Sequence, residues 1–251
     1  MAGIIQAKGI RKSYKYQQGL LPIIDIDNWS AESGDAIALL GPSGSGKSTF
    51  LHLLGGVLPV DQGKLEVAGH DVSAMKESER DSYRSSAVGY VFQDFYLIPS
   101  LTVKQNVELV MPKTMNKSER TKLMDEWFER VGLQDRMNQL PSRLSRGQQQ
   151  RAAIIRAMIN KPPIVLADEP TGSLDFETGS SVMRLLLDMS RENGSTLITV
   201  THDLHLAELF PVKLQFAEIN SCLKGQQGRD ASAALAAASP LKAAASGGWR
   251  S

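Results

Sequence analysis

The stretch Gly41-Pro42-Ser43-Gly44-Ser45-Gly46-Lys47-Ser48-Thr49 decides the fold of this chain. It follows residues 36 to 40, Ala-Ile-Ala-Leu-Leu, an apolar run that predicts a buried parallel strand. It leads into residues 48 to 54, which predict a helix. A glycine-rich stretch between a strand and a helix is typical of a phosphate-binding loop. The alternative, a turn that only joins two elements, requires Gly, Lys and Ser to fall in this register by accident.

Each residue type in this loop has a physical role in holding phosphate. Gly41, Gly44 and Gly46 allow backbone N–H groups to turn inward and approach phosphate oxygens. The helix that follows presents its positive N-terminal end to the same anion. Lys47 adds a point charge, and Ser48 supplies a hydroxyl ligand for magnesium.

A second segment, Ile164-Val165-Leu166-Ala167-Asp168-Glu169, predicts a buried strand that ends in two carboxylates. Successive residues of a strand point to opposite sides, so the two acids can have different roles. Asp168 is the candidate magnesium ligand, and Glu169 is the candidate general base that polarises an attacking water. Taken alone, an acidic pair is more typical of a solvated turn or a helix cap. Together with the loop, it predicts a site for a nucleoside triphosphate and magnesium.

Composition limits the class of protein. The 251 residues suffice for one large α/β domain, alone or with a smaller lobe. The 28 basic and 27 acidic residues nearly balance, which argues against nucleic acid as a partner. A single cysteine, Cys222, excludes an internal disulfide framework, and the N-terminus lacks a secretory signal, so we expect a reducing cytosol. No apolar run reaches the roughly 18 residues that span a bilayer.

Apolar strand patterns that alternate with helical segments predict an α/β fold with a mainly parallel sheet. Residues 1 to 35 predict strands with turns at Gly19, Pro22 and Gly34. The other predicted strands are residues 64 to 70, Val88 to Phe92, Ile164 to Asp168 and Leu197 to Thr201.

The pattern changes between residues 93 and 147, where helices are predicted at about 103 to 111 and 118 to 131, without a strand. This segment predicts a helical lobe inserted into the α/β core. From Gly225 onward the composition reduces to Gly, Gln, Ala and Ser, which predicts a flexible or artificially added tail at 225–251. An alanine-rich helix that docks on a partner is the alternative for this tail.

A phosphate-binding loop leaves many NTPase families open, and a further motif narrows the choice. Leu144-Ser145-Arg146-Gly147-Gln148-Gln149-Gln150-Arg151 resembles the LSGGQ signature of ABC ATPases and lies upstream of Asp168 at the family's usual separation. In that family, the residues at Ser145 and Gly147 contact the terminal phosphate of ATP held by the opposite protomer. Locally, Ser145 is also explained as the N-cap of a helix.

Other motifs follow in the order that an ABC ATPase requires. Gln93 resembles the glutamine that senses metal and water and joins the core to the helical lobe. Ser173-Leu174-Asp175 resembles the D-loop, and His202 resembles the switch histidine that holds the terminal phosphate. Tyr14 occupies the place of the aromatic residue that stacks on adenine, although Tyr16 lies on the same face of its strand.

The resemblance implies the site as follows. The catalytic residues would be Gln93, Glu169 and His202, and the metal ligands Ser48, Gln93 and Asp168. The ATP-binding residues would be Tyr14, Gly41, Pro42, Ser43, Gly44, Ser45, Gly46, Lys47, Ser48, Thr49, Ser145, Gly147, Gln148 and Asp175.

The resemblance also implies the architecture. It implies a P-loop NTPase (RecA-like) core, an N-terminal antiparallel β subdomain and an inserted helical subdomain. The ABC domain would span 1–224, with the core at 1–93 and 156–224 and the helical subdomain at about 94–155.

The resemblance further implies an ATPase that uses ATP and Mg²⁺, forms a head-to-tail homodimer and drives membrane-spanning permease subunits from the cytoplasmic face of the inner membrane. Several motifs are similar to those of the lipoprotein-release and macrolide-efflux branch, which points to export or to extraction of lipoproteins or lipids. The alternative is an ABC ATPase that regulates cell division or acts in another membrane or nucleic-acid complex. One departure is Arg146, which stands where the signature has its first glycine.

Overall fold

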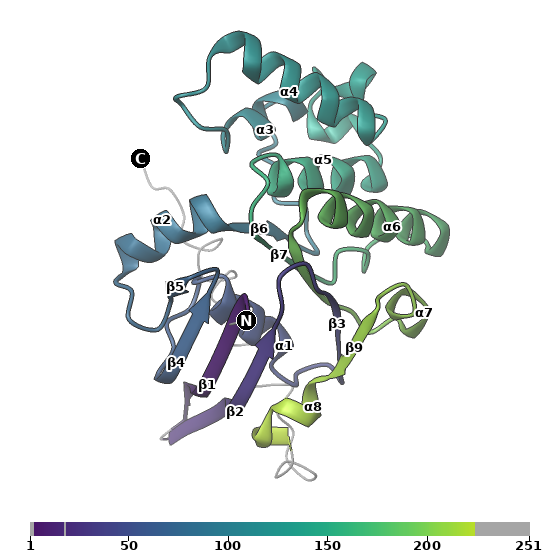
Figure 1. The fold of residues 1–251 in the computed structure, drawn as a ribbon. Helices are drawn as coiled ribbons and strands as arrows, with labels where there is room; N and C mark the ends of the chain where they lie inside the picture. Colours follow the sequence, from purple (N-terminus) through teal and green to yellow (C-terminus); the bar gives the residue numbers. More distant parts are fainter. Residues whose placement is uncertain (1–2, 18, 224–251) are drawn as a thin grey trace.

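The computed structural model describes residues 3–17 and 19–223 (Figure 1). The predicted tail at 225–251 lies outside these residues. The described residues form an antiparallel sheet, a parallel sheet and a helical lobe, so the predicted fold class is confirmed.

The antiparallel sheet is built mainly from the N-terminal residues. Its strands are β1 (Ile5–Tyr16), β2 (Gly19–Ala31), β4 (Gln62–Val67) and β5 (His70–Asp71), in the order β2-β1-β4-β5. The predicted turn at Pro22 is wrong, because Pro22 lies inside β2 and pairs with Ser13 at a register shift. A proline is tolerated there because β2 is an edge strand, where a missing N–H need not break a ladder.

The parallel sheet holds the core. Its strands are β6 (Val88–Val91), β7 (Ile164–Asp168), β8 (Thr196–Val200), β3 (Ala36–Leu40) and β9 (Val212–Gln215), in the order β6-β7-β8-β3-β9. Each neighbouring pair is parallel. β9 is absent from the sequence prediction, because its four residues are short and partly polar.

Two hydrophobic clusters cover the two faces of this sheet. Ile37 and Leu39 of β3 belong to the cluster shared with α1 (Lys47–Leu54) and the antiparallel sheet. Leu40, one residue further, belongs to the cluster shared with α5 (Arg146–Met158) and α6 (Phe176–Asn193). This alternation follows from the two-residue period of a strand and explains why both faces of β3 are apolar.

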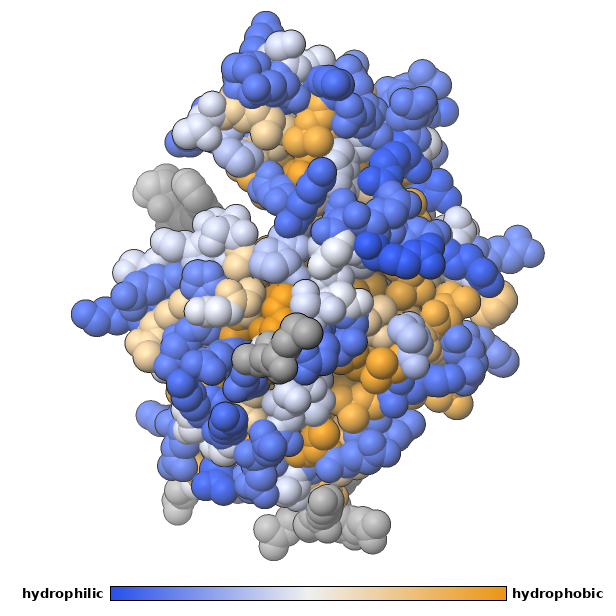
Figure 2. Space-filling view, in the orientation of Figure 1, coloured by the Kyte–Doolittle hydropathy of each residue, from blue (hydrophilic) through white to orange (hydrophobic). Residues whose placement is uncertain are grey.

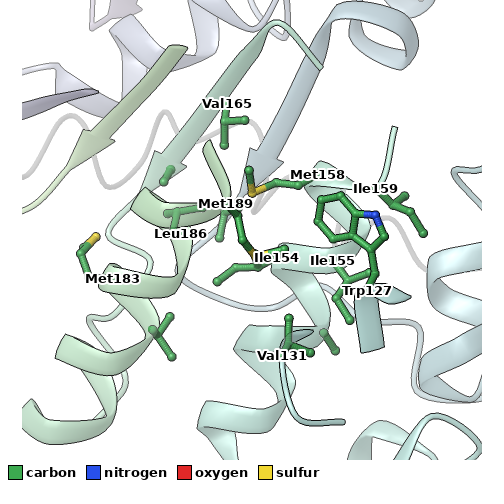
Figure 3. Packing of buried hydrophobic residues seen from close by; sticks show 14 of the residues in the cluster. Trp127, Val131, Ile154, Ile155, Met158, Ile159, Val165, Met183, Leu186 and Met189 are labelled. Carbon is green, nitrogen blue, oxygen red and sulfur yellow. The ribbon is translucent and has the colours of Figure 1, made fainter. Parts of the chain in front are cut away.

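The helical lobe packs on the second of these clusters. It contains α3 (Val103–Glu108), α4 (Lys117–Arg130), η1 (Gln134–Arg136) and η2 (Pro141–Arg143). Figure 3 shows Trp127 and Val131 facing Ile155 of α5. The helix α3 ends three residues before the predicted limit. The helix α5 runs without interruption across residue 155, where the predicted helical subdomain ends.

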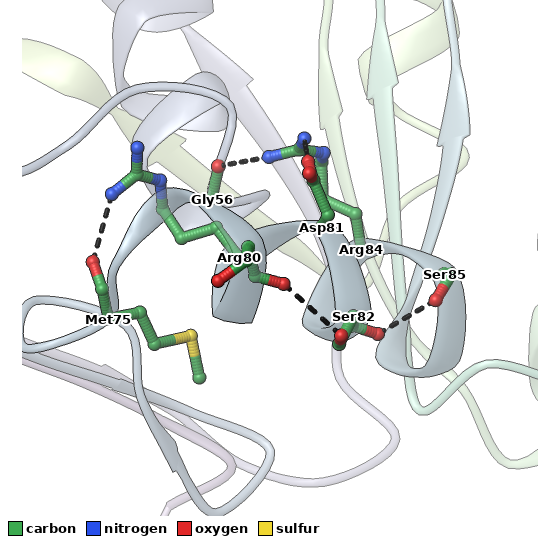
Figure 4. Close-up of polar contacts among 8 residues, drawn as sticks. Gly56, Met75, Arg80, Asp81, Ser82, Arg84 and Ser85 are labelled. Carbon is green, nitrogen blue, oxygen red and sulfur yellow. Dashed lines mark hydrogen bonds and ion pairs between the residues drawn. The ribbon is translucent and has the colours of Figure 1, made fainter.

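The helix α2 (Glu77–Ala87) was not predicted, because its serines and charges leave no apolar stripe. Hydrogen bonds attach it to its surroundings instead. Arg84 donates to the Gly56 carbonyl at 2.6 Å, just after α1, and Arg80 donates to the Met75 carbonyl at 2.9 Å (Figure 4). Tyr83 is buried and donates to the Leu54 carbonyl at 2.7 Å.

The remaining elements follow β8 and complete the described chain. They are α7 (Leu204–Ala207), α8 (Phe216–Ile219) and η3 (Ser221–Leu223). Among the described residues, no helix has the length and apolar character needed to cross a membrane.

Candidate ATP and magnesium site

Four segments from distant parts of the sequence meet at one edge of the parallel sheet. Parallel strands have their carboxyl ends at the same edge, where α/β proteins bind ligands. The loop 41–46 follows β3, Gln93 follows β6, Glu169 follows β7 and His202 follows β8. The strand order therefore brings the predicted loop, carboxylates, glutamine and histidine to one place.

The loop has the backbone conformation that its glycines predict. Gly41, Gly44 and Gly46 have φ angles of 152°, 75° and 96°, which residues with a side chain rarely adopt. A Cβ at Gly46 would also lie 2.9 Å from Ile23 Cγ2. The left-handed Gly46 directs the chain into α1, whose first residue is Lys47.

Lys47 lies within the loop that it is predicted to serve. Its Nζ donates to the carbonyl oxygens of Gly41 and Pro42, both at 2.8 Å. Burial lowers the pKa of Lys47, and the nearby carboxylates of Glu169 and Asp168 act in the opposite direction. The positive charge is therefore held at the mouth of the loop, facing two negative groups.

Ser48 and Asp168 form the oxygen pair predicted for magnesium. The Ser48 hydroxyl donates to Asp168 Oδ1 at 3.0 Å and joins residues that are 120 positions apart. Burial raises the pKa of Asp168 to about 6. A hydroxyl beside a poorly solvated carboxylate is a donor set that suits a hard divalent cation such as Mg²⁺.

Glu169 and His202 form a second pair beside the first. Glu169 Oε2 lies 3.2 Å from His202 Nδ1. The strand-alternation argument for Glu169 is wrong, because β7 ends at Asp168 and Glu169 has a φ angle of 46°. Its N–H donates to the Val200 carbonyl at 3.0 Å, so the end of β8 fixes this turn.

Gln93 approaches the same carboxylate across Gly172. A Cβ placed at Gly172 would lie 3.2 Å from Gln93 Nε2 and 3.5 Å from Glu169 Oε2. The Gly172 N–H also donates to the Glu169 carbonyl at 3.0 Å. A glycine at 172 therefore leaves room for the amide and the carboxylate on either side.

Asp175 lies at the edge of this site. It lines a cavity of about 140 Å³ together with Glu169, Gly172 and His202. Its carboxylate accepts from the Thr178 N–H at 2.9 Å and caps α6, and these hydrogen bonds lower its pKa.

The signature residues are held on α5. Ser145 caps α5, because its hydroxyl accepts from the Gln148 N–H at 3.3 Å while Gln148 Oε1 accepts from the Ser145 N–H at 3.0 Å. Gly147 is buried against α6, where a Cβ would lie 2.5 Å from Thr178 Cγ2. Within the described residues, no hydrogen bond joins the 145–148 segment to the 41–49 segment.

Tyr14 lies near the start of α1, beside Thr49, and burial raises the pKa of its hydroxyl. Tyr16 is 45% exposed at the far end of β1. The structure thus places Tyr14 close to the phosphate loop. Its stacking on adenine stays a prediction.

Sequence reasoning missed residues that hold the site in place. Asn220 is fully buried, accepts from the Asp25 N–H at 2.9 Å and donates to the carbonyls of Ile23 and Ser45 at 2.8 and 3.4 Å. It thereby attaches the phosphate loop to β2 and to the C-terminal segment. No local motif surrounds Asn220, so only the fold reveals its partners.

Comparisons with known proteins agree with this geometry. The family model described as "ABC transporter" matches residues 24–172, more than half of the chain. The chain belongs to the ABC transporter family. It is 36% identical over 230 residues to the lipoprotein-releasing system ATP-binding protein LolD of Idiomarina loihiensis, covering 90% of this chain and 98% of the relative. It is 39% identical over 209 residues to the uncharacterized ABC transporter ATP-binding protein MJ0796 of Methanocaldococcus jannaschii, covering 81% and 89%.

Solved structures support the same assignment. The chain matches a dimeric structure of the ATP-binding cassette MJ0796 bound to ADP and Pi, with a TM-score of 0.76, 36% identity and coverage of 84% of this chain and 94% of that one. The predicted family, the ATPase class and the use of ATP and Mg²⁺ are therefore confirmed. The chain is therefore an ATP-hydrolysing, nucleotide-binding subunit of the ABC family.

Replacing Gly172 with Ala tests whether this residue sets the spacing of Gln93 and Glu169. The added methyl should push the Gln93 amide by a few tenths of an ångström and lower kcat about tenfold, because catalysis is sensitive to small displacements. Steady-state ATP hydrolysis measures this decrease in kcat. Gly179→Ala is the control, since its Cβ would make only an ordinary contact with Thr171 at 3.4 Å. Unchanged kcat in Gly172→Ala would contradict the spacing role.

Asp168→Asn should stabilise the protein free of magnesium and nucleotide while it abolishes hydrolysis. Because the pKa of Asp168 rises from 3.8 to about 6, the carboxyl ionises more readily in the unfolded chain. The free energy of unfolding of the parent protein therefore falls as the pH rises from about 4 to about 6. Above that range the substitution should add on the order of 1–3 kcal/mol.

Urea denaturation at about pH 7.5, above the pKa of Asp168 in the folded protein, and at about pH 4, near its pKa in the unfolded chain, measures this difference. The gain should be present at the higher pH and nearly absent at the lower one. The exposed Asp135→Asn variant is the control, and a stability of Asp168→Asn equal to that of the parent at both pH values would disprove the electrostatic argument.

Proposed function

We propose that two copies of this chain bind two ATP molecules at a head-to-tail interface and drive membrane-spanning permease subunits from the cytoplasmic face of the membrane. One observation carries the proposal. The Ser48–Asp168 and Glu169–His202 pairs meet at one sheet edge, whereas the signature residues Ser145 and Gly147 are held on α5.

In this proposal, the first copy supplies the groups that hold and cleave ATP. The loop N–H groups and Lys47 bind the phosphates, and Ser48 and Asp168 hold Mg²⁺, which neutralises phosphate charge when bound. Glu169 accepts a proton from the attacking water, and its contact with His202 keeps its carboxylate oriented.

The second copy supplies the rest of the pocket. Ser145 and Gly147 contact the terminal phosphate across the interface, and Asp175 contributes from the same copy. Asp175 also lines a cavity with Glu169 and His202 of its own chain. ATP then favours the closed dimer because its terminal phosphate contacts both copies, and cleavage removes that differential contact. The dimeric cassette structure of the relative MJ0796 with ADP and Pi supports this arrangement.

Exposed apolar side chains offer a surface for the permease. Tyr96 and Ile98, just after Gln93, are 51% and 42% exposed, and Leu109 and Val110 at the end of α3 are 60% and 39% exposed. Exposed apolar groups of this size mark interaction sites when they gather. Figure 2 shows hydrophobic surface on the helical lobe among hydrophilic side chains.

The LolD relatives suggest the kind of cargo. Relatives named lipoprotein-releasing system ATP-binding proteins, from three bacteria, are 36 to 40% identical to this chain. We therefore propose that the chain acts with permeases that extract lipoproteins or lipids from the membrane, or that export other substrates.

Glu169→Gln tests the ATPase half of the proposal. The amide keeps the shape of the side chain and cannot accept the proton, so hydrolysis should fall by about 100-fold or more while ATP still binds. A sizing column should then show a stable dimer that depends on ATP. Asp135→Asn, which lies far from the motifs, is the control variant. Normal hydrolysis, or a monomer in the presence of ATP, would sink the assignment of Glu169.

Co-purification tests the transport half. We expect the chain, tagged and expressed in its native host, to be recovered from detergent-solubilised membranes together with a permease-like protein. Replacing Tyr96 and Ile98 by Ser should reduce that recovery, because it removes exposed apolar surface. Recovery with cell-division or nucleic-acid machinery in place of a permease would overturn the transport role.

A further inference from the structure

Arg146 is the one residue of the signature that departs from the family pattern, and its side chain has a defined partner. Its guanidinium lies over the ring of Phe95, with Cζ 5.6 Å from the ring centroid. Phe95 is two residues after Gln93. A glycine at position 146, as in the usual signature, has no side chain to make this contact. The loop around Gln93 is therefore tied directly to the first turn of α5.

The rest of α5 holds the same loop by its backbone. The Arg156 guanidinium donates to the Phe95 carbonyl at 2.8 Å and to the Tyr96 carbonyl at 2.5 Å. Gln150 is fully buried and donates to the carbonyls of Pro170 and Phe92 at 2.5 and 3.4 Å. Both ends of the Gln93 segment are thus bound to α5, and Gln150 also links α5 to the residue after Glu169.

These contacts differ in where they act along α5. Arg146 and Arg156 are ten residues apart, which is about 15 Å of helix, yet both reach Phe95, one through the ring and the other through the carbonyl. Only Arg146 lies within the signature, next to Ser145. Tyr96 has a φ angle of 44°, a strained conformation that Arg156 helps to hold.

We propose that Arg146 is a positioning residue that couples the signature to Gln93 of the same chain through the ring of Phe95. This inference rests on the proposed function, in which Ser145 contacts ATP of the partner and Gln93 serves ATP of its own chain. A shift of the first turn of α5 on binding the partner's ATP then moves Phe95 and, with it, Gln93. The cation–π contact thus adds a link between the two ATP sites of the dimer that starts at the signature itself.

The test is a double-mutant cycle on ATP hydrolysis. Arg146→Gln and Phe95→Leu should each lower kcat about two- to fivefold, the size expected for an exposed cation–π contact, with KM for ATP changed less than about twofold. The double variant should be no slower than either single one, because both remove the same contact. Arg146→Lys retains the cation and should restore most of kcat.

Two controls separate positioning from other roles. Arg143→Gln removes an exposed charge three residues earlier and should leave kcat unchanged. Hydrogen exchange of residues 92 to 96 in the nucleotide-free chain should rise in Arg146→Gln and Phe95→Leu and stay low in Arg146→Lys. Thermal unfolding verifies that each variant remains folded.

The following outcomes would overturn the proposal. A normal kcat in Arg146→Gln would contradict the proposal. A decrease of kcat in Arg146→Gln that Phe95→Leu does not reproduce would also contradict it. Loss of the ATP-dependent dimer in Glu169→Gln/Arg146→Gln, but not in Glu169→Gln/Phe95→Leu, would assign Arg146 to the partner's phosphate instead. A parent protein without ATPase activity would refute the proposed function alone, because hydrogen exchange tests the Arg146–Phe95 contact without ATP.

Discussion

The parallel pairing of β7, β8 and β3 is the constraint on which the site depends. β8 lies between the other two strands, so the Ser48–Asp168 hydrogen bond passes across its carboxyl end. His202 lies two residues beyond the end of β8, and it meets Glu169 beside the first pair. One strand order therefore brings together the loop, the predicted metal ligands and the predicted catalytic pair. Any change that shifted the register of β8 would separate all three.

The charged side chains Asp168 and Lys47 lose hydration free energy by burial, and bound magnesium and phosphate would offset this loss. Burial raises the pKa of Asp168 and lowers that of Lys47, so each group is less stable in its charged form than it would be in water. Their opposite charges compensate in part. Bound magnesium would add positive charge next to Asp168, and bound phosphates would add negative charge next to Lys47, which would complete the compensation. The same burial that strains the site thus favours the ligands.

The sequence predicts the residues of the site better than it predicts the residues that hold the site in place. The loop, Asp168, Glu169 and His202 follow apolar runs that are strands, so their place at the sheet edge follows from the parallel topology. Pro22 in the sequence favours a turn, but the strand β2 accepts it at the edge of the sheet, and this edge position is not visible in the sequence. Asn220 contacts Ile23, 197 residues away in the chain, and Gln150 contacts residues 20 and 58 positions away. Local sequence patterns cannot reveal such distant partners.

The two readings of Ser145, a helix cap and a phosphate ligand, are compatible. As the cap of α5, its hydroxyl accepts from the Gln148 N–H through one lone pair. The hydroxyl proton is not used in that bond, so in the proposed dimer it would remain available to a phosphate oxygen of the partner's ATP. Gly147 is required by packing against Thr178, which holds the first turn of α5 against α6. The capped, closely packed turn keeps Ser145 in a fixed position, which the contact proposed across the dimer would require.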